Sequence, residues 1–352
     1  MYASIIPTTF AGFVRRVLSP ILALAVLSGC GVNPIYHTTG VVITGYAESE
    51  ATPYVLQMSD AKMACSMGSA LDPLVSSFGR VTDFPNETGS LMQLLSANCA
   101  EAKAWEADLA YLRADYQGNV AKAKDARTQA KRWHKVTAER RLETFRRAMK
   151  AYEYDVTADS PECPFLYNDQ DELTFLLGLL TGMQAIVNDT NSGGTAGVPK
   201  NIAPQAERAA QCLDNEKWGG IPNAIRANVW LLLPDTQPTM APEPFKLLKA
   251  SSQLGIEKGF RASMALEAVA AQSAGRDEVL ADVIKRYADS EKGFTVRAEY
   301  ALVDQVAHSV IQYMSDRHWT QEYGHRTPSA YFGRMSKKSS SDAEAMDLDG
   351  LL

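Results

Sequence analysis

Residues 173–187 read LTFLLGLLTGMQAIV, and this stretch contains no charged side chain. It is apolar on every face of a helix, so it predicts a central helix that is buried on all sides. It is too short to span a bilayer, which takes about 20 apolar residues. Gly178 and Gly182 would let neighbouring helices approach closely. The sequence DQDE at 169–172 indicates a capped helix N-terminus.

Helical patterns recur along most of the chain. Apolar spacing predicts helices over about 60–78, 90–118 and 120–154, of which the third is highly charged and should have a solvated face. Shorter helices, separated by Gly and Pro, follow over about 201–214, 221–233, 243–253, 257–273, 276–288 and 298–315. We therefore predict an all-α fold of antiparallel helix hairpins. It has an N-terminal helical region (59–160) and a TPR-like helical-repeat solenoid (161–335).

The first 29 residues have the pattern of a lipoprotein signal peptide. Arg15 and Arg16 precede a run of mostly apolar residues, and Leu-Ser-Gly at 27–29 precedes Cys30. This matches the bacterial lipobox, so Cys30 is predicted to be acylated and to anchor the chain in a membrane. A plain signal peptide with an incidental cysteine is the alternative. Gly31 replaces the aspartate of an inner-membrane retention signal, which favours a periplasmic protein on the outer membrane.

Two segments are expected to lie outside the helical body. Residues 30–58 contain GVVITGY at 40–46, which is typical of a strand, and we expect an extended tether there. The tail at 336–352 is rich in Lys, Ser and Asp, and it is expected to be disordered.

Four cysteines remain once Cys30 is acylated: Cys65, Cys99, Cys163 and Cys212. An even number in an oxidising periplasm indicates two disulfides, for which three connectivities are possible. We favour the pairing of neighbours along the chain, Cys65 with Cys99 and Cys163 with Cys212. Four buried free thiols are the alternative.

No arrangement of residues points to catalysis, to a cofactor or to a bound metal. The five histidines lack the HExxH and HxH spacings of metal sites, and the chain has no GxSxG nucleophile motif. Asp316, His318 and His325 are close in sequence, but a structural role at the end of the last helix is the preferred interpretation. The net charge is −6, and removal of Arg15 and Arg16 makes it more negative. An acidic chain of this kind is not expected to bind nucleic acid.

Large apolar residues on the predicted helices could line a cavity for a hydrophobic small-molecule ligand. The candidates are Trp105, Tyr111, Phe175, Leu179, Met183, Trp230 and Phe260. Such residues more often form an ordinary core. A connected apolar cavity of several hundred cubic ångströms would favour ligand binding.

Several of these features together resemble the T component of TRAP transporters. They are the lipobox cysteine, the sequence FLLG at 175–178, Val198-Pro199 and the sequence QAERAAQCLD at 205–214. The resemblance covers about 120–290, and it extends to related bacterial lipoproteins of sterol transport. It implies helical repeats around a hydrophobic cleft and no catalysis, but it assigns a role to no individual residue.

Together these features predict a lipoprotein that is not an enzyme. It would bind a lipid- or sterol-like ligand as one component of an envelope transport system. The alternative is a scaffold that docks a periplasmic solute-binding protein on a concave polar face. A solid core with a grooved polar surface would favour the scaffold.

Overall fold

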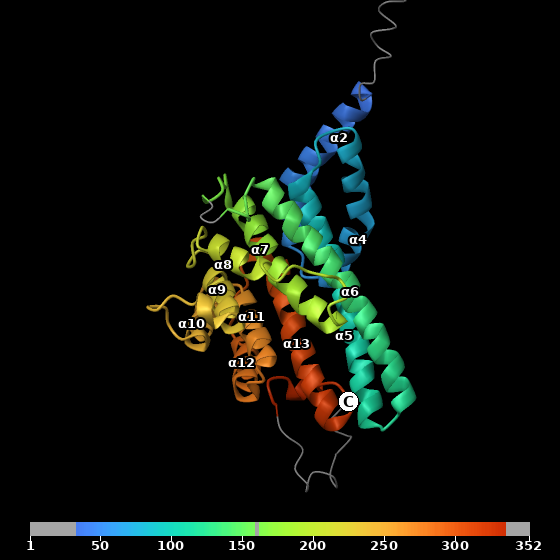
Figure 1. The fold of residues 1–352 in the computed structure, drawn as a ribbon, viewed down its shortest axis with the longest axis vertical. Helices are drawn as coiled ribbons and strands as arrows, with labels where there is room; N and C mark the ends of the chain where they lie inside the picture. The colour runs from blue at the N-terminus through green and yellow to red at the C-terminus, as the bar shows by residue number, and fades with distance from the viewer. Residues whose placement is uncertain (1–32, 159–161, 336–352) are drawn as a thin grey trace, which may run out of the picture.

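The computed structural model describes residues 33–158 and 162–335 (Figure 1), and every regular element within them is a helix. The all-α fold class predicted from the sequence is therefore confirmed. The predicted signal peptide, Cys30 and the predicted disordered tail at 336–352 lie outside the described residues.

The described part of the expected tether, residues 33–58, is mostly helical and not extended. Its elements are α2 (Pro34–Tyr46), a π-helical turn (Ala47–Ala51) and α3 (Thr52–Leu56). The Asn33 side chain accepts the backbone N–H of Ile35 at 3.0 Å and so caps α2, and proline occupies the first helical position. Val55 and Leu56 are buried, so this segment is a packed part of the fold.

Three long helices form one side of the molecule: α4 (Ala61–Ser77), α5 (Asn86–Tyr116) and α6 (Val120–Ala151). Polar caps set the N-terminal ends of α4 and α6, where the side chains of Asp60 and Asn119 accept backbone N–H groups at 2.9 and 3.1 Å. Helices α5 and α6 form an antiparallel pair that runs along most of the long axis (Figure 1).

The inner face of α6 carries a buried polar network, although its outer face is exposed as predicted. Arg141 donates to Glu101 at 2.5 Å and to the amide oxygen of Asn188 at 2.6 Å. His134 lies 2.7 Å from Asp108, and its other ring nitrogen lies 3.2 Å from Asn188. Through Asn188, this network connects α5 and α6 to the next long helix of the chain. Buried polar groups are almost always hydrogen-bonded in this way.

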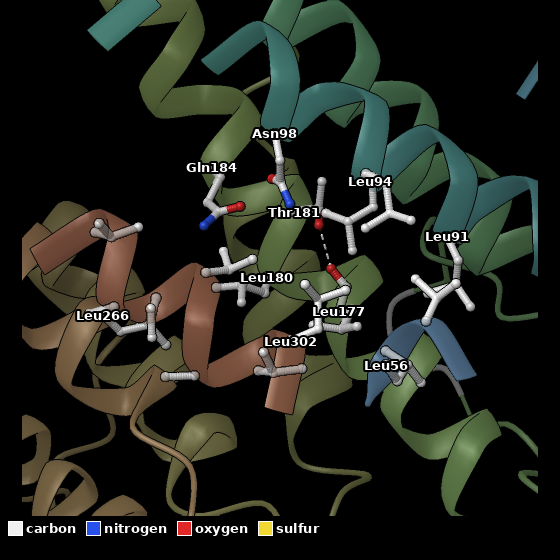
Figure 2. Close-up of a pocket in the computed structure, with 18 of the residues that line it drawn as sticks. Leu56, Leu91, Leu94, Asn98, Leu177, Leu180, Thr181, Gln184, Leu266 and Leu302 are labelled. Atoms are coloured by element: carbon white, nitrogen blue, oxygen red, sulfur yellow. Dashed lines mark hydrogen bonds between the residues drawn. The ribbon is translucent and has the colours of Figure 1, made fainter. Parts of the chain in front are cut away.

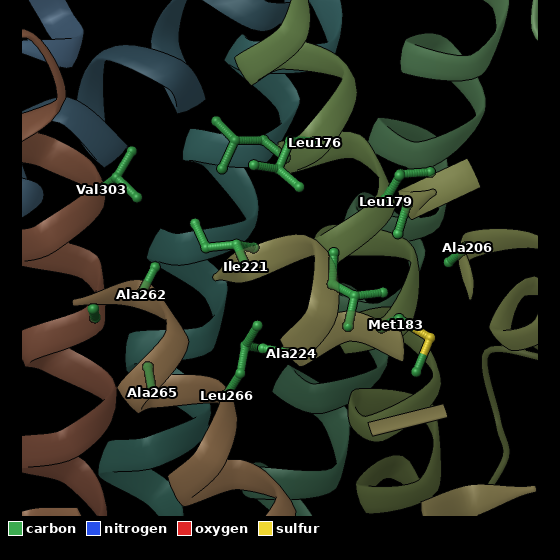
Figure 3. Packing of buried hydrophobic residues seen from close by; sticks show 14 of the residues in the cluster. Leu176, Leu179, Met183, Ala206, Ile221, Ala224, Ala262, Ala265, Leu266 and Val303 are labelled. Atoms are coloured by element: carbon green, nitrogen blue, oxygen red, sulfur yellow. The ribbon is translucent and has the colours of Figure 1, made fainter. Parts of the chain in front are cut away.

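Helix α7 (Asp169–Ser192) is the predicted central helix, and it packs against α6. Its cap is Asn168, one residue before the predicted sequence, and the Asn168 side chain accepts the N–H groups of Gln170 and Asp171. Figure 3 shows Leu176, Leu179 and Met183 packed in the core. Leu180 and Gln184, however, are only half-buried, so neighbouring helices do not pack closely against this face of α7.

The remaining α-helices of the described chain are α8 (Ile202–Ala210), α9 (Ile221–Leu232), α10 (Pro244–Lys258), α11 (Ala262–Ser273), α12 (Asp277–Ser290) and the longer α13 (Ala301–Tyr323). Consecutive helices from α8 to α12 pack on one another, whereas α13 returns to contact α5 and α11. The TPR-like solenoid remains a prediction.

Both predicted disulfides are present. Cys65 of α4 is bonded to Cys99 of α5, with Cα atoms 5.2 Å apart. Cys163, in the segment before α7, is bonded to Cys212, just after α8, with Cα atoms 5.4 Å apart. The favoured pairing is confirmed, and both separations are normal for a disulfide.

Candidate ligand-binding cavity

An apolar cavity lies where five helices meet (Figure 2). It is bounded by α3, α5, α7, α11 and α13, so segments from both ends of the described chain form its walls. We call this space the apolar cavity. Every one of these helices also contributes to the core, which fixes the walls in place.

Each long wall is one face of a helix. Residues at positions i, i+3, i+4 and i+7 lie on the same face, and α5, α7 and α11 all follow this spacing. The residues concerned are Leu91, Leu94, Leu95 and Asn98; Leu177, Leu180, Thr181 and Gln184; and Ala262, Ala265, Leu266 and Val269. Leu302, Val303, Val306, Ala307 and Val310 of α13 close the far side. The space remains because small side chains such as Ala262, Ala265 and Ala307 lie among larger ones.

No charged side chain lines the apolar cavity within the described residues. The Thr181 hydroxyl donates to the carbonyl oxygen of Leu177 at 2.6 Å, so its donor is already used. The Thr52 hydroxyl is buried and has no hydrogen-bond partner in the described part of the chain. A buried hydroxyl left in this state is costly, and Thr52 is one of the few polar residues in the wall of the apolar cavity.

Two side-chain amides form a second polar element. Asn98 of α5 and Gln184 of α7 lie at the same end of the apolar cavity, as Figure 2 shows. Both are half-buried, and neither side chain makes a hydrogen bond to another of the described residues. Each amide supplies donors and an acceptor without a charge. A neutral polar group could therefore bind here.

The apolar cavity is narrow but partly open. Its volume is about 90 Å³. A second hollow, with a volume of about 110 Å³, lies between α7, α9 and α11. The two share four lining residues, so they are adjacent: Leu180, Gln184, Leu266 and Val269.

A more polar hollow adjoins the other side of the apolar cavity, and Asn98 and Val306 line both. Its volume is about 260 Å³. The rings of Trp105 and Tyr313 stack in it at 4.6 Å. Burial raises the pKa of the Asp316 carboxyl in this hollow. Hydrogen bonds from Thr327 act in the opposite direction and lower this pKa.

The seven residues expected to bind a ligand lie at different places. Phe175, Leu179, Trp230 and Phe260 are packed in the core and almost inaccessible. Met183 borders the second hollow, and Trp105 borders the polar hollow. The guanidinium carbon of Arg127 lies over the ring of Tyr111, 5.2 Å from the centre of that ring. None of the seven lines the apolar cavity.

The residues that do line it were visible in the sequence as ordinary helix faces. Leu91, Leu94 and Leu95 belong to an apolar stripe, and Leu177 and Leu180 belong to the stretch 173–187. The one signal in the sequence that could have identified the cavity was the presence of polar residues on these helix faces. Asn98 and Gln184 are amides on otherwise apolar helix faces.

Two further findings bear on chemistry. Among residues 33–158 and 162–335, no group of three or more His, Cys, Asp and Glu side chains is placed to hold a metal ion. Within the same ranges, no helix has both the length and the apolar character needed to cross a bilayer.

Comparisons with known proteins add no family assignment. No protein-family model, no curated protein and no solved structure matches the chain.

Proposed function

We propose that this protein binds an uncharged hydrophobic ligand, lipid- or sterol-like, as a non-catalytic component of an envelope transport system. The supporting observation is the apolar cavity, whose lining within the described chain lacks charged side chains but includes the hydroxyl of Thr52 and the amides of Asn98 and Gln184. Ligand sites of this kind combine an apolar wall with a few polar groups that orient the ligand.

The lining argues for a neutral ligand over a fatty acid. An ionised carboxylate inside the cavity would lose its hydration without gaining a cationic partner, at a cost of several kcal/mol. An alcohol, ketone or ester would pair with an amide or hydroxyl at no such cost. This difference in the cost of burial is why we propose an uncharged ligand.

We further propose that the protein works in the periplasm, attached to the outer membrane through acylated Cys30. The sequence around Cys30 supports this, and two disulfides suit an oxidising compartment. Substitution Cys30→Ala should move the mature chain from the membrane fraction to the soluble periplasmic fraction. Membrane-bound wild-type protein whose Cys30 carries no acyl group by mass spectrometry would contradict the anchor.

The ligand is best tested by native mass spectrometry of protein purified from its own cell envelope. We expect an uncharged lipid to co-purify, and Ala265→Phe to abolish its retention by filling the apolar cavity. Ala121→Phe is the matched control, because Ala121 is exposed at the start of α6. The proposal fails if nothing co-purifies and added neutral lipids show no saturable binding.

The scaffold alternative has one observation in its favour. The volume of the apolar cavity, about 90 Å³, is below the several hundred cubic ångströms expected of a ligand site. A scaffold for a periplasmic solute-binding protein would keep its partner when the cavity is filled. If the Ala265→Phe variant still supports transport, this result would therefore favour the scaffold.

A further inference from the structure

Helix α2 combines a lack of charge with unusually exposed apolar side chains. No Asp, Glu, Lys or Arg occurs between Asn33 and Ala47. Ile35, Val42 and Tyr46 are 71%, 63% and 63% exposed. Single exposed apolar residues are normal on a protein surface, but a connected set on one helix marks an interaction surface.

These three residues share one face of α2. At about 100° per residue they fall within about 40° of one another around the helix axis. Gly40 lies on another side, where a Cβ atom would be 2.7 Å from the Thr82 side chain. One side of α2 therefore packs on the turn after α4. The side with Ile35, Val42 and Tyr46, the outer face of α2, has no such cover.

The position of α2 suggests what covers this face. The helix leaves the body at one end of the long axis, as Figure 1 shows, and Pro34 follows Cys30 by four residues. Four residues reach at most about 14 Å, so acyl chains on Cys30 would hold α2 at the membrane surface. The 13 residues of α2 are about 20 Å long, which is too short to span a bilayer.

We propose that α2 lies in the membrane interface, with its outer face toward the lipid acyl chains. The apolar side chains enter the boundary between headgroups and acyl chains, and Tyr46 suits this layer because its ring is apolar and its hydroxyl polar. The helix holds the protein body at a fixed orientation to the membrane, which acyl chains alone do not. This inference uses the proposed anchor at Cys30 but is independent of the apolar cavity.

The first test uses the mature chain with Cys30→Ala, so that α2 acts without the acyl chains. Phosphatidylcholine vesicles should bind this protein weakly, and Val42→Asp should lower the partition coefficient by about tenfold or more. Met240→Asp is the matched control, since Met240 is 95% exposed and lies in another part of the molecule. Binding should not depend on salt, because α2 is uncharged. Circular dichroism would verify that both variants fold.

The second test uses the acylated protein reconstituted in the same vesicles. An environment-sensitive dye on Val42→Cys should shift to the blue and be quenched by spin-labelled lipids, whereas the dye on Met240→Cys should remain in water. A dye at residue 42 that stays in water would overturn the proposal even if Cys30 anchors the protein. Sedimentation that shows a dimer of the Cys30→Ala protein, lost with Val42→Asp, would identify the face as a self-association surface instead.

Discussion

The Arg261 guanidinium and the Asp304 carboxylate form a two-point ion pair, with Nε 3.0 Å from Oδ1 and Nη2 2.7 Å from Oδ2. The backbone N–H of Arg261 donates to the same carboxylate at 2.9 Å. Both side chains are buried. The pair joins the start of α11 to α13, beside Ala262 and Val303 in the wall of the apolar cavity. It therefore holds two walls of the cavity together.

Breaking this pair should be strongly destabilising. Asp304→Ala leaves a buried guanidinium without its partner, and we expect a loss of about 3–5 kcal/mol in the free energy of unfolding. The double variant Arg261→Met/Asp304→Leu removes both charges and should recover most of that loss. Urea denaturation of the three proteins measures the difference. A loss below about 1 kcal/mol in the single variant would show that the pair is not a buried link.

Gly178 should be necessary for the contact between α6 and α7. A Cβ atom there would lie 2.4 Å from the Cβ of Ala148, so Gly178→Ala forces the helices apart and should cost about 1–3 kcal/mol. Gly45 of α2 is the control, because nothing lies within 4 Å of its Cβ position. Gly45→Ala should stabilise by up to about 1 kcal/mol through helix propensity alone. Thermal melts that rank the two variants in the opposite order would contradict the close approach.

Local sequence patterns predicted most of the helices but misassigned α2. The run Val41-Val42-Ile43 favours a strand when only neighbours along the chain are considered. Its helical form is set by the Asn33 cap and by packing of Gly40 on the turn at Thr82, about 40 residues later. Contacts between residues that are so far apart along the chain leave no signal in a local sequence pattern. The central helix was predictable because its apolar character is visible on every face.

The cavity could not be predicted in the same way. The most apolar aromatic residues, such as Phe175 and Trp230, were natural candidates for a ligand site, and for the same reason they fill the core. A cavity forms where side chains fail to fill space. Ala262 and Ala265 leave that space only because α11 is placed opposite α5 and α7. Sequence spacing identified the faces of these helices but not which faces meet.

The disulfide between Cys163 and Cys212 should contribute substantially to stability. The two cysteines are 49 residues apart, and closing a loop of that size contributes about 4 kcal/mol if the effect is entropy lost by the unfolded chain. Cys163→Ser/Cys212→Ser should lower the free energy of unfolding in guanidinium by about this amount. Non-reducing peptide mapping of the wild-type protein should recover the two peptides linked. Free thiols at both positions in periplasmic protein would contradict the pairing.

Stability should fall as the pH rises toward neutrality because of Glu87. Burial raises the pKa of this carboxyl to about 7, the hydrogen bond from Gln170 opposes the shift, and the nearby carboxylates of Glu48 and Asp171 add to it. The folded protein then holds a proton that the unfolded chain releases above its ordinary pKa of 4.5. The stabilisation is complete below pH 4.5 and is lost as the pH rises through about 7.

Glu87→Gln should remove this dependence on pH. Its melting temperature should match that of the wild type near pH 4, where Glu87 is protonated in both states, and exceed it at pH 8. The control is Glu139→Gln, because Glu139 is exposed on α6. Melting profiles between pH 4 and pH 8 that run parallel for Glu87→Gln and the wild type would contradict the raised pKa.

Asn98 and Gln184 should decide which apolar molecules bind. An amide paired with a ligand hydroxyl contributes about 0.5–1.5 kcal/mol, so Asn98→Leu or Gln184→Leu should weaken binding of a long-chain alcohol by up to about tenfold. Neither change should weaken binding of the hydrocarbon of equal chain length, because leucine only extends the apolar wall. Gln93→Leu is the control, since Gln93 is half-buried on α5 but does not line the apolar cavity. Titration calorimetry with the two ligands gives the comparison. If alcohol and hydrocarbon lose affinity equally, the amides shape the cavity and do not recognise a polar group.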